Sequence, residues 1–226
     1  MQGNNSWTDV RMFYTKTGTA KYISHLDTVR CLSRAMKRAA VPIWFTEGFN
    51  PHAFLTFAMP LSLGVESYCE TVDFRLTEEV DLTELTERLN ATMPEGISVK
   101  KIAVPKFKAS DIRYAEYEIV FAYPNESLIA KAHTLLASEE IMAEKKAKQG
   151  RKKVTKEINI KEHIKTYELS QKDGKLILKT VLSSGTSVNI NPSLLISAIV
   201  KDTGIDERDA DITKIQSYTE NMEIFR

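Results

Sequence analysis

Strand-like and helix-like hydrophobic periods alternate along this chain in a fixed order, and that order limits the folds it can adopt. In the first half, a strand pattern over residues 10–16 precedes a helix pattern that begins near Ser24 and ends near Ala39. Further strand patterns, the first of them over 43–45, lead to a second helix, capped by Asp81, and to a last strand over 97–104. Without the long connection in its middle, the first half has the order βαββαβ.

The second half has the same order of elements, with one insertion. Its elements are strands over 114–123, 164–169, 175–182 and 211–218, and helices that begin near Asn125 and Pro192. Asp173-Gly174 favours a tight hairpin, and a strand-like insertion over 154–160 follows the first helix. The βαββαβ order is that of the ferredoxin-like arrangement. We therefore predict an α+β protein of two tandem ferredoxin-like halves with antiparallel sheets, in domains over 1–105 and 114–226 joined by a linker over 106–113.

The composition is that of an ordinary globular protein. Of 226 residues, 42% are hydrophobic and 27% are charged, and the net charge of +1 gives no sign of a nucleic-acid partner. No apolar run reaches the roughly 20 residues that span a bilayer, so we expect a cytoplasmic protein without a membrane partner. The two cysteines, Cys31 and Cys69, are predicted to be reduced, buried thiols. Their number excludes a four-thiolate zinc or iron–sulfur site within this chain.

Residues 46–52 concentrate special backbone and side-chain properties. Gly48 can adopt a positive φ, Asn50 tolerates the left-handed region, and Pro51 fixes its own φ. His52 can donate or accept a hydrogen bond near neutral pH. The segment is interpreted either as a tight loop between strands or as a loop that presents Asn50 and His52 to a ligand.

Basic side chains gather in two stretches of this nearly neutral chain. One is a stripe on the first predicted helix, formed by Arg30, Arg34 and Arg38. The other surrounds Gly150 and comprises Lys145, Lys146, Lys148, Arg151, Lys152, Lys153 and Lys156. Both fit contacts to the phosphates of a nucleic acid, which position the ligand without reading its bases. The alternative for the second stretch is a solvated helix end and loop.

Aromatic side chains also lie on or beside the predicted sheet of the first half. They are Tyr14, Trp44, Phe45, Phe49 and Phe57. Exposed aromatics on a ferredoxin-like sheet stack RNA bases in one common RNA-binding module. The alternative is that these side chains belong to the core.

Side chains suited to catalysis are few. Ser24 lies next to His25, but it suits a helix cap better than a nucleophile. His25, Asp27 and His52 converge if the helix start lies beside the loop that contains Asn50. We therefore predict a ligand-binding site of His25, Asp27, Asn50 and His52, with no catalytic residue, metal or cofactor.

Three motifs of the first half resemble a known family. They are Lys21-Tyr22-Ile23-Ser24-His25-Leu26-Asp27, then Glu47-Gly48-Phe49-Asn50-Pro51-His52, and Pro60-Leu61-Ser62-Leu63-Gly64-Val65-Glu66-Ser67, with Arg34-Ala35 after the first. The chain resembles the radical SAM-linked family of uncharacterised proteins, the DUF2344 domain, over nearly its whole length. The family pattern continues Pro-His-Pro, whereas Ala53 follows His52 here. Members of the family are encoded beside a radical SAM protein or fused to its C-terminus, so the resemblance implies a radical SAM partner.

We therefore expect an accessory or substrate-recognition protein that works with a separate radical SAM enzyme and binds RNA, such as tRNA or rRNA. One alternative is a metal-independent ribonuclease that uses His25 or His52 as its acid or base. Another is a purely protein-binding scaffold.

Overall fold

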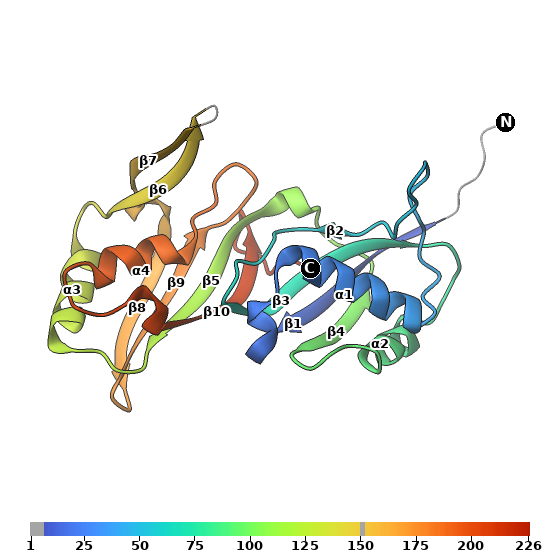
Figure 1. Ribbon diagram of the computed structural model, residues 1–226, viewed down its shortest axis with the longest axis horizontal. Helices are drawn as coiled ribbons and strands as arrows, with labels where there is room; N and C mark the ends of the chain where they lie inside the picture. The colour runs from blue at the N-terminus through green and yellow to red at the C-terminus, as the bar shows by residue number, and fades with distance from the viewer. Residues whose placement is uncertain (1–6, 150–151) are drawn as a thin grey trace. The chain divides into compact units, whose positions relative to one another are not determined.

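The computed structural model describes residues 7–149 and 152–226. The chain divides into two compact units, the first comprising Met1–Ile112 with Ile224–Arg226 and the second Arg113–Glu223. Each unit combines helices with an antiparallel sheet, which gives an α+β protein as predicted (Figure 1). Within the described residues, no helix combines the length and the apolar character needed to cross a bilayer.

The first unit is built on a sheet with the strand order β4-β1-β3-β2, in which each neighbouring pair is antiparallel. Its elements are β1 (Thr8–Lys16), a 3₁₀ helix (Gly18–Tyr22), α1 (His25–Arg38), β2 (Thr56–Phe57), β3 (Val65–Leu76), α2 (Leu82–Asn90) and β4 (Ile97–Ala103). Val10 pairs with Phe74 and Met12 pairs with Val72, so buried apolar side chains lie opposite one another. The two helices add Leu32, Met36, Leu85 and Leu89 to this core.

The strand expected over 43–45 is replaced by isolated bridges. Ile43 bridges Leu76, and the next amide, of Trp44, donates to the carbonyl of Arg75 at 2.9 Å. The chain then leaves the sheet edge and turns back on itself, so that Phe45 bridges Ala53. We call residues 44–54 the excursion. The regular strand that follows it, β2, is only 2 residues long.

The second unit has a sheet with the strand order β10-β5-β9-β8. Its elements are β5 (Ile112–Phe121), α3 (Glu126–Ala137), β6 (Met142–Gln149), β7 (Lys152–Asn159), β8 (Ile164–Lys172), β9 (Lys175–Ser183), α4 (Pro192–Val200) and β10 (Ala210–Thr219). β6 and β7 form a separate two-stranded hairpin. When that hairpin is set aside, the elements and the strand positions follow the same order as in the first unit.

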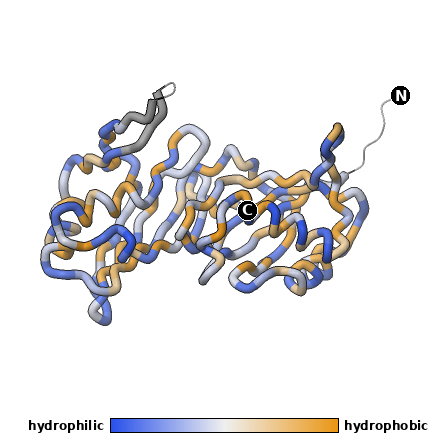
Figure 2. The backbone as a smooth tube through the Cα atoms, viewed as in Figure 1, coloured by the Kyte–Doolittle hydropathy of each residue, from blue (hydrophilic) through white to orange (hydrophobic). Residues whose placement is uncertain are grey.

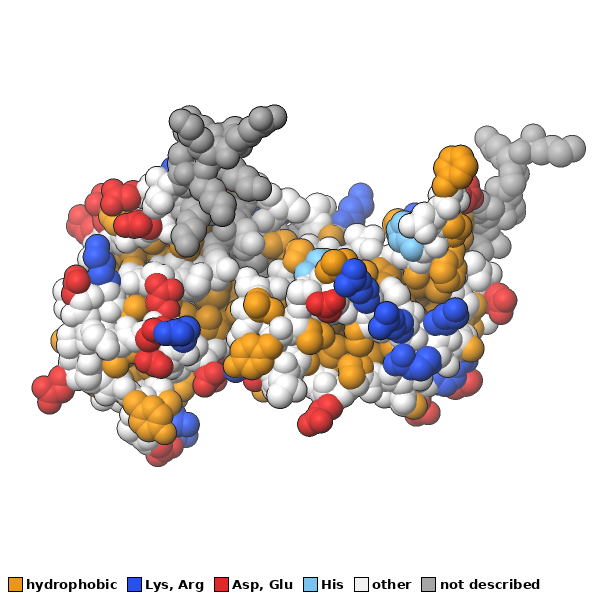
Figure 3. Space-filling model, viewed as in Figure 1, with side chains coloured by type: hydrophobic (Ala, Val, Ile, Leu, Met, Phe, Trp, Pro, Cys, Tyr) orange, Lys and Arg blue, Asp and Glu red, His pale blue; other side chains and the backbone are white. Residues whose placement is uncertain are grey.

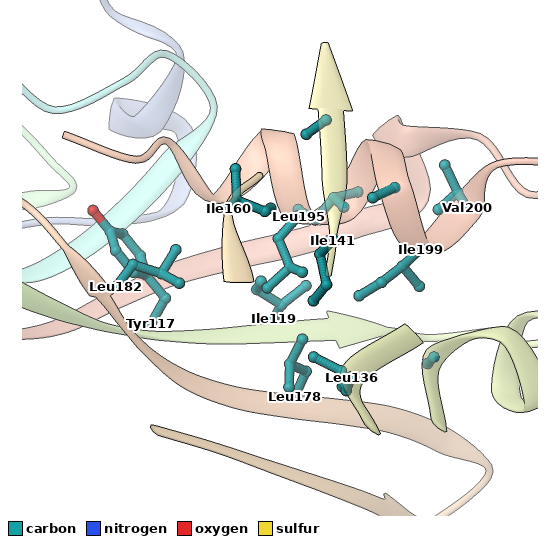
Figure 4. Packing of buried hydrophobic residues seen from close by; sticks show 14 of the residues in the cluster. Tyr117, Ile119, Leu136, Ile141, Ile160, Leu178, Leu182, Leu195, Ile199 and Val200 are labelled. Carbon is teal, nitrogen blue, oxygen red and sulfur yellow. The ribbon is translucent and has the colours of Figure 1, made fainter. Parts of the chain in front are cut away.

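The core of the second unit lies between its sheet and its helices. Alternate residues of β5 are buried, and Ile119 pairs with Leu178 of β9. Figure 4 shows Leu195 of α4 and Ile141 pointing toward Ile119. Each fully buried side chain of this size contributes about 1.5–3 kcal/mol. The alternation of hydrophobic and hydrophilic residues that produces such faces is visible along the strands in Figure 2.

The hairpin predicted at Asp173-Gly174 is confirmed. Lys172 of β8 pairs with Lys175 of β9, which leaves a two-residue turn between the strands. Both turn residues have positive φ, 52° for Asp173 and 75° for Gly174. A turn with two such residues matches the twist of the strands that it joins, which explains why Asp-Gly is a strong hairpin signal.

Candidate nucleic-acid interface

The first turn of α1 is closed by its own polar side chains. Ser24 caps the helix, because its Oγ accepts a hydrogen bond from the amide of Asp27 at 3.1 Å. The same hydroxyl donates to Oδ2 of Asp27 at 2.7 Å, and Arg30 donates to Oδ1 at 3.2 Å. These hydrogen bonds, that of Ser24 foremost, hold the pKa of Asp27 below its usual value. The Asp27 carboxylate therefore already serves the helix start.

The imidazole of His25 lies exposed at the first residue of α1. Its ring meets Phe57 of β2 edge-on, with the ring centroids 4.8 Å apart and an interplanar angle of 84°. Edge-to-face contact between rings is favourable and fixes orientation. His25 is thus held against the short strand β2.

A buried polar junction lies beneath the first and third motifs. Lys16 and Glu70 are only 2% and 3% exposed, and Lys16 Nζ donates to the carbonyl of Ile23 at 2.8 Å. Ser67 Oγ donates to Oε1 of Glu70 at 2.8 Å. Burial lowers the pKa of Lys16 and the charge of Glu70 opposes that shift, while burial and Glu70 together raise the pKa of Tyr14 well above its usual value.

Backbone contacts join the two motifs over this junction. The amide of Gly64 donates to the carbonyl of Lys21 at 2.9 Å, and the amide of Gly18 donates to Oε1 of Glu66 at 3.1 Å. Lys21 and Glu66 form an ion pair at 3.8 Å. Much of the motif sequence over 21–27 and 60–67 therefore has a structural role.

The tip of the excursion is closed by hydrogen bonds within itself. The Thr46 amide donates to the carbonyl of His52 at 2.9 Å, and the His52 amide donates to Oγ1 of Thr46 at 3.2 Å. The Nδ1 atom of His52 lies 3.1 Å from both Thr46 Oγ1 and the carbonyl oxygen of Asn50. Gly48 has a φ of 119°, a value that favours glycine. This closed tip leaves the side chain of Phe49 fully exposed.

The base of the excursion is held by an aromatic cluster. The guanidinium of Arg75 lies 4.6 Å from the ring centroid of Trp7, 5.3 Å from that of Trp44 and 4.8 Å from that of Phe54. Its Nε donates to Oδ1 of Asp9 at 3.0 Å. The five aromatic side chains considered as a stacking surface therefore differ in exposure. Tyr14 is buried, Trp44 and Phe57 are half-buried, and Phe45 and Phe49 are exposed.

The two predicted histidines have different surroundings. His25 contacts Phe57, whereas His52 bonds to Thr46 and Asn50 within the excursion. Figure 1 shows the excursion well separated from the N-terminal end of α1, the end at which His25 lies. The joint site of His25, Asp27, Asn50 and His52 stays a prediction.

The exposed face of α1 carries the arginine stripe. Arg30, Arg34 and Arg38, with Asp27, Cys31 and Pro94, line a hollow of about 360 Å³ that we call the arginine hollow. Arg38 is oriented by a 2.6 Å hydrogen bond that its Nη2 donates to the carbonyl of Thr92. Figure 3 shows Lys and Arg side chains gathered over this helix.

Cys31 and Cys69 are reduced thiols, as predicted, but both are half-buried rather than buried. Cys31 lines the arginine hollow, where burial raises the pKa of its thiol against the opposing charges of Arg38 and Arg34. In the part of the chain that the structure describes, no group of three or more His, Cys, Asp or Glu residues could hold a metal ion.

The second basic stretch lies on the β6–β7 hairpin, so the helix end considered for it is wrong. Lys145 pairs with Lys156, and Lys148 pairs with Lys153, along its backbone. The side chains of 145–149 and 152–154, and Arg151 altogether, lie outside the described residues. The predicted phosphate contacts of Lys145, Lys146, Lys148, Arg151, Lys152 and Lys153 therefore stay a prediction.

A larger hollow in the second unit was not predicted from the sequence. It measures about 610 Å³ and is lined by residues of β6, β7, α4 and the loops beside α4, among them Glu144, Glu157, Asn191, Leu194 and Lys201. The hollow depends on how the β6–β7 hairpin packs against α4. No local pattern in the sequence predicts such packing.

Comparison with known proteins places the chain in one family. No curated protein matches it. A chain in a crystal structure of a Cbf5–Nop10–Gar1 complex is 11% identical with a TM-score of 0.49, over 93% of this chain and 50% of that one, so this chain spans about half the length of that relative. An unknown protein from Galdieria sulphuraria is 10% identical with a TM-score of 0.27, over 92% of this chain and 99% of that one. Residues 10–192 match the family described as uncharacterized protein conserved in bacteria (DUF2344), and the chain therefore belongs to the DUF2344 family.

Proposed function

We propose that this protein is a cytoplasmic, RNA-binding accessory protein that presents a substrate RNA to a separate radical SAM enzyme. The observation that carries the proposal is the arginine hollow on α1. Three guanidinium groups line one concave surface of a chain whose net charge is only +1. Local concentration of arginine in a neutral protein favours a phosphate-bearing partner over non-specific attraction.

The spacing of the arginines suits a nucleic-acid backbone. Arg30, Arg34 and Arg38 follow one another at four-residue intervals, which places successive residues about 6 Å apart along the helix axis. Guanidinium groups bind phosphate oxygens in a bidentate manner. Among the described residues that line the hollow, Asp27 is the acidic one, and its hydrogen bonds with Ser24 and Arg30 limit its repulsion of an anion.

We infer further that both units are ferredoxin-like. In each, the strand that comes third in the βαββαβ order lies between the first and the second, as a split βαβ arrangement requires. The proposed interface is nevertheless the helix rather than the sheet. Tyr14 on β1 is buried and therefore offers no ring to a base, and Phe13 on the same strand is half-buried beneath Lys101.

The proposal of a radical SAM partner rests on the family resemblance and on the cysteine count. A chain with two cysteines, Cys31 and Cys69, supplies too few thiolates for a cluster of its own. The radical chemistry would belong to the partner, and this chain would contribute recognition. Membership in the DUF2344 family supports the resemblance but names no partner.

Filter-binding titrations against total tRNA at low and high salt test the RNA part. We expect salt-dependent binding by the wild type, and a weaker affinity with a shallower salt slope for Arg34→Glu, by roughly one unit of slope per lost phosphate contact. Lys37→Glu is the matched control, because Lys37 lies on the same helix and does not line the hollow. Binding without salt dependence, or equal losses in both variants, would refute the proposal. The paired change Lys152→Glu with Lys153→Glu tests the hairpin in the same assay.

Co-purification of the native protein tests the partnership. Recovery of a radical SAM protein together with RNA supports the proposal, whereas recovery of that protein without RNA favours the scaffold alternative. Incubation of labelled RNA with wild type and His52→Ala tests the ribonuclease alternative, for which cleavage lost in the variant is the required result.

A further inference from the structure

The tip of the excursion carries the aromatic ring of Phe49, which no neighbouring side chain covers. Phe49 is the most exposed of the large hydrophobic residues in the described part of the chain. A single exposed apolar residue is ordinary on a protein surface. Phe49 differs because the segment that carries it is ordered at both its tip and its base.

The contacts that hold the excursion lie on both sides of Phe49 and leave its ring exposed. Thr46 and His52 close the tip through backbone and side-chain hydrogen bonds, and Arg75 holds the base through Trp44 and Phe54. Gly48, with its φ of 119°, turns the chain immediately before Phe49. Because the backbone that carries the ring is already hydrogen-bonded, binding through Phe49 costs little further backbone freedom.

The surroundings of the ring favour a nucleobase over a protein. Binding aromatics in protein interfaces lie at the centre of a well-packed patch surrounded by other contacts. Beside Phe49 the neighbours in sequence are Glu47, Gly48, Asn50 and Pro51, all exposed. The same unit carries the arginine hollow, so phosphate and base contacts are available on one unit. A base inside a duplex has both faces covered, whereas a base in a loop or single strand offers a free face.

We propose that Phe49 stacks on an unpaired base, so that the substrate class is single-stranded or looped RNA rather than duplex. This inference rests on the proposed RNA-binding function. Stacking takes place between the ring face and the base and forms no covalent bond. The arginine hollow would bind phosphates without regard to sequence, and Phe49 would select RNA segments in which a base is accessible.

The test compares two RNAs with the full-length protein. One is a hairpin with 2-aminopurine in its loop, and the other is the same label inside a continuous duplex. We expect the wild type to bind the hairpin more tightly and to quench its fluorescence. Phe49→Ala should weaken hairpin binding about tenfold, remove the quenching and leave the salt slope unchanged, because a stacking contact is worth roughly 1–3 kcal/mol and releases no counterions. Phe49→Trp should retain both.

Tyr123→Ala is the matched control, because Tyr123 is a comparably exposed aromatic residue of the second unit. If Phe49→Ala binds the hairpin as the wild type and Tyr123→Ala do, the stacking inference fails while the RNA-binding proposal stands. If the wild type binds neither RNA, both fail. If Phe49→Ala loses a co-purifying protein but keeps its RNA affinity, the ring serves a protein contact and the inference is refuted.

Discussion

The two motif segments of the first unit, residues 21–27 and 46–52, direct their contacts in opposite ways. The first makes contacts inward, since the carbonyl of Ile23 receives a hydrogen bond from buried Lys16 and that of Lys21 receives one from Gly64. The second makes contacts within itself, through Thr46 and His52. One segment therefore closes a buried junction, and the other forms a self-supporting loop on the surface.

The difference shows that a motif rich in polar residues is not by itself a binding or catalytic site. Both segments contain a histidine and several polar residues, and both belong to the resemblance that identifies the family. The two segments differ in where their hydrogen bonds lead and in how buried their neighbours are. These two properties distinguish residues that stabilise the fold from residues that the loop exposes to a ligand. Substitutions should therefore affect the junction through stability and the excursion through local order.

The largest loss of stability should come from a substitution in the buried polar junction. Glu70→Gln keeps the shape of the side chain but removes the charge that favours buried, protonated Lys16. Removing a charge that stabilises a second, buried charge costs up to about 3 kcal/mol. We expect the free energy of unfolding, measured with urea, to fall by that amount, and the added change Lys16→Met to recover much of it.

Glu66→Gln is the control for this change, because Glu66 pairs with Lys21 at 3.8 Å and is partly exposed. Its effect should stay below about 1 kcal/mol. If Glu70→Gln behaves like Glu66→Gln, the junction does not contribute as its burial indicates, and the contrast between the two segments is lost.

An intermediate effect should come from the base of the excursion. Arg75→Gln removes the guanidinium that lies over Trp7, Trp44 and Phe54 and its ion pair with Asp9. We expect a loss of about 1–2 kcal/mol, because cation–π contacts are strongest where they are shielded from water. The near-ultraviolet circular dichroism of the tryptophans should weaken in parallel.

The control is Lys101→Gln, which removes a single contact between Lys101 and the ring of Phe13 at 4.7 Å. An unchanged tryptophan signal in Arg75→Gln would show that the excursion does not need its aromatic base. The stacking role of Phe49 would then lose its structural support.

A smaller, local effect should come from the tip. Thr46→Val preserves the shape of the side chain but removes the hydroxyl that accepts from the His52 amide and lies beside its Nδ1. One hydrogen bond contributes about 1 kcal/mol, so amide exchange at Thr46 should accelerate roughly fivefold. Thr56→Val, at an exposed threonine of β2, should leave that exchange rate unchanged. Equal rates in the two variants would contradict a closed tip.

The elements of this fold were largely predictable from the sequence, whereas the candidate sites were less so. Hydrophobic periods and caps are local, and they identified α1 with its cap Ser24, and the turn at Asp173-Gly174. The isolated bridges at Ile43 and Phe45 were not predicted, because they depend on where the chain leaves the sheet edge. The buried junction was missed for a similar reason, since Lys16 and Glu70 lie far apart in the sequence and only the pairing of β1 with β3 brings them near each other.

The smallest effect concerns the charge of Asp27 at the start of α1. Hydrogen bonds from Ser24 and Arg30 lower the pKa of this carboxyl, so the stabilisation that its ionised form gives is present at neutral pH and is lost as the pH falls through the lowered pKa. Ser24→Ala should raise the pKa of Asp27 toward its usual value, which carbon NMR of the carboxyl measures between about pH 2 and 6. Asp81, whose pKa is lowered by the amides of Glu84 and Thr83 in α2, should not respond. A response of Asp81, or none of Asp27, would mean that Ser24 does not hold the carboxylate. Asp27 would then be available to a ligand in the arginine hollow. In that case residues 21–27 would not be purely structural, and they would differ less from the exposed residues 46–52.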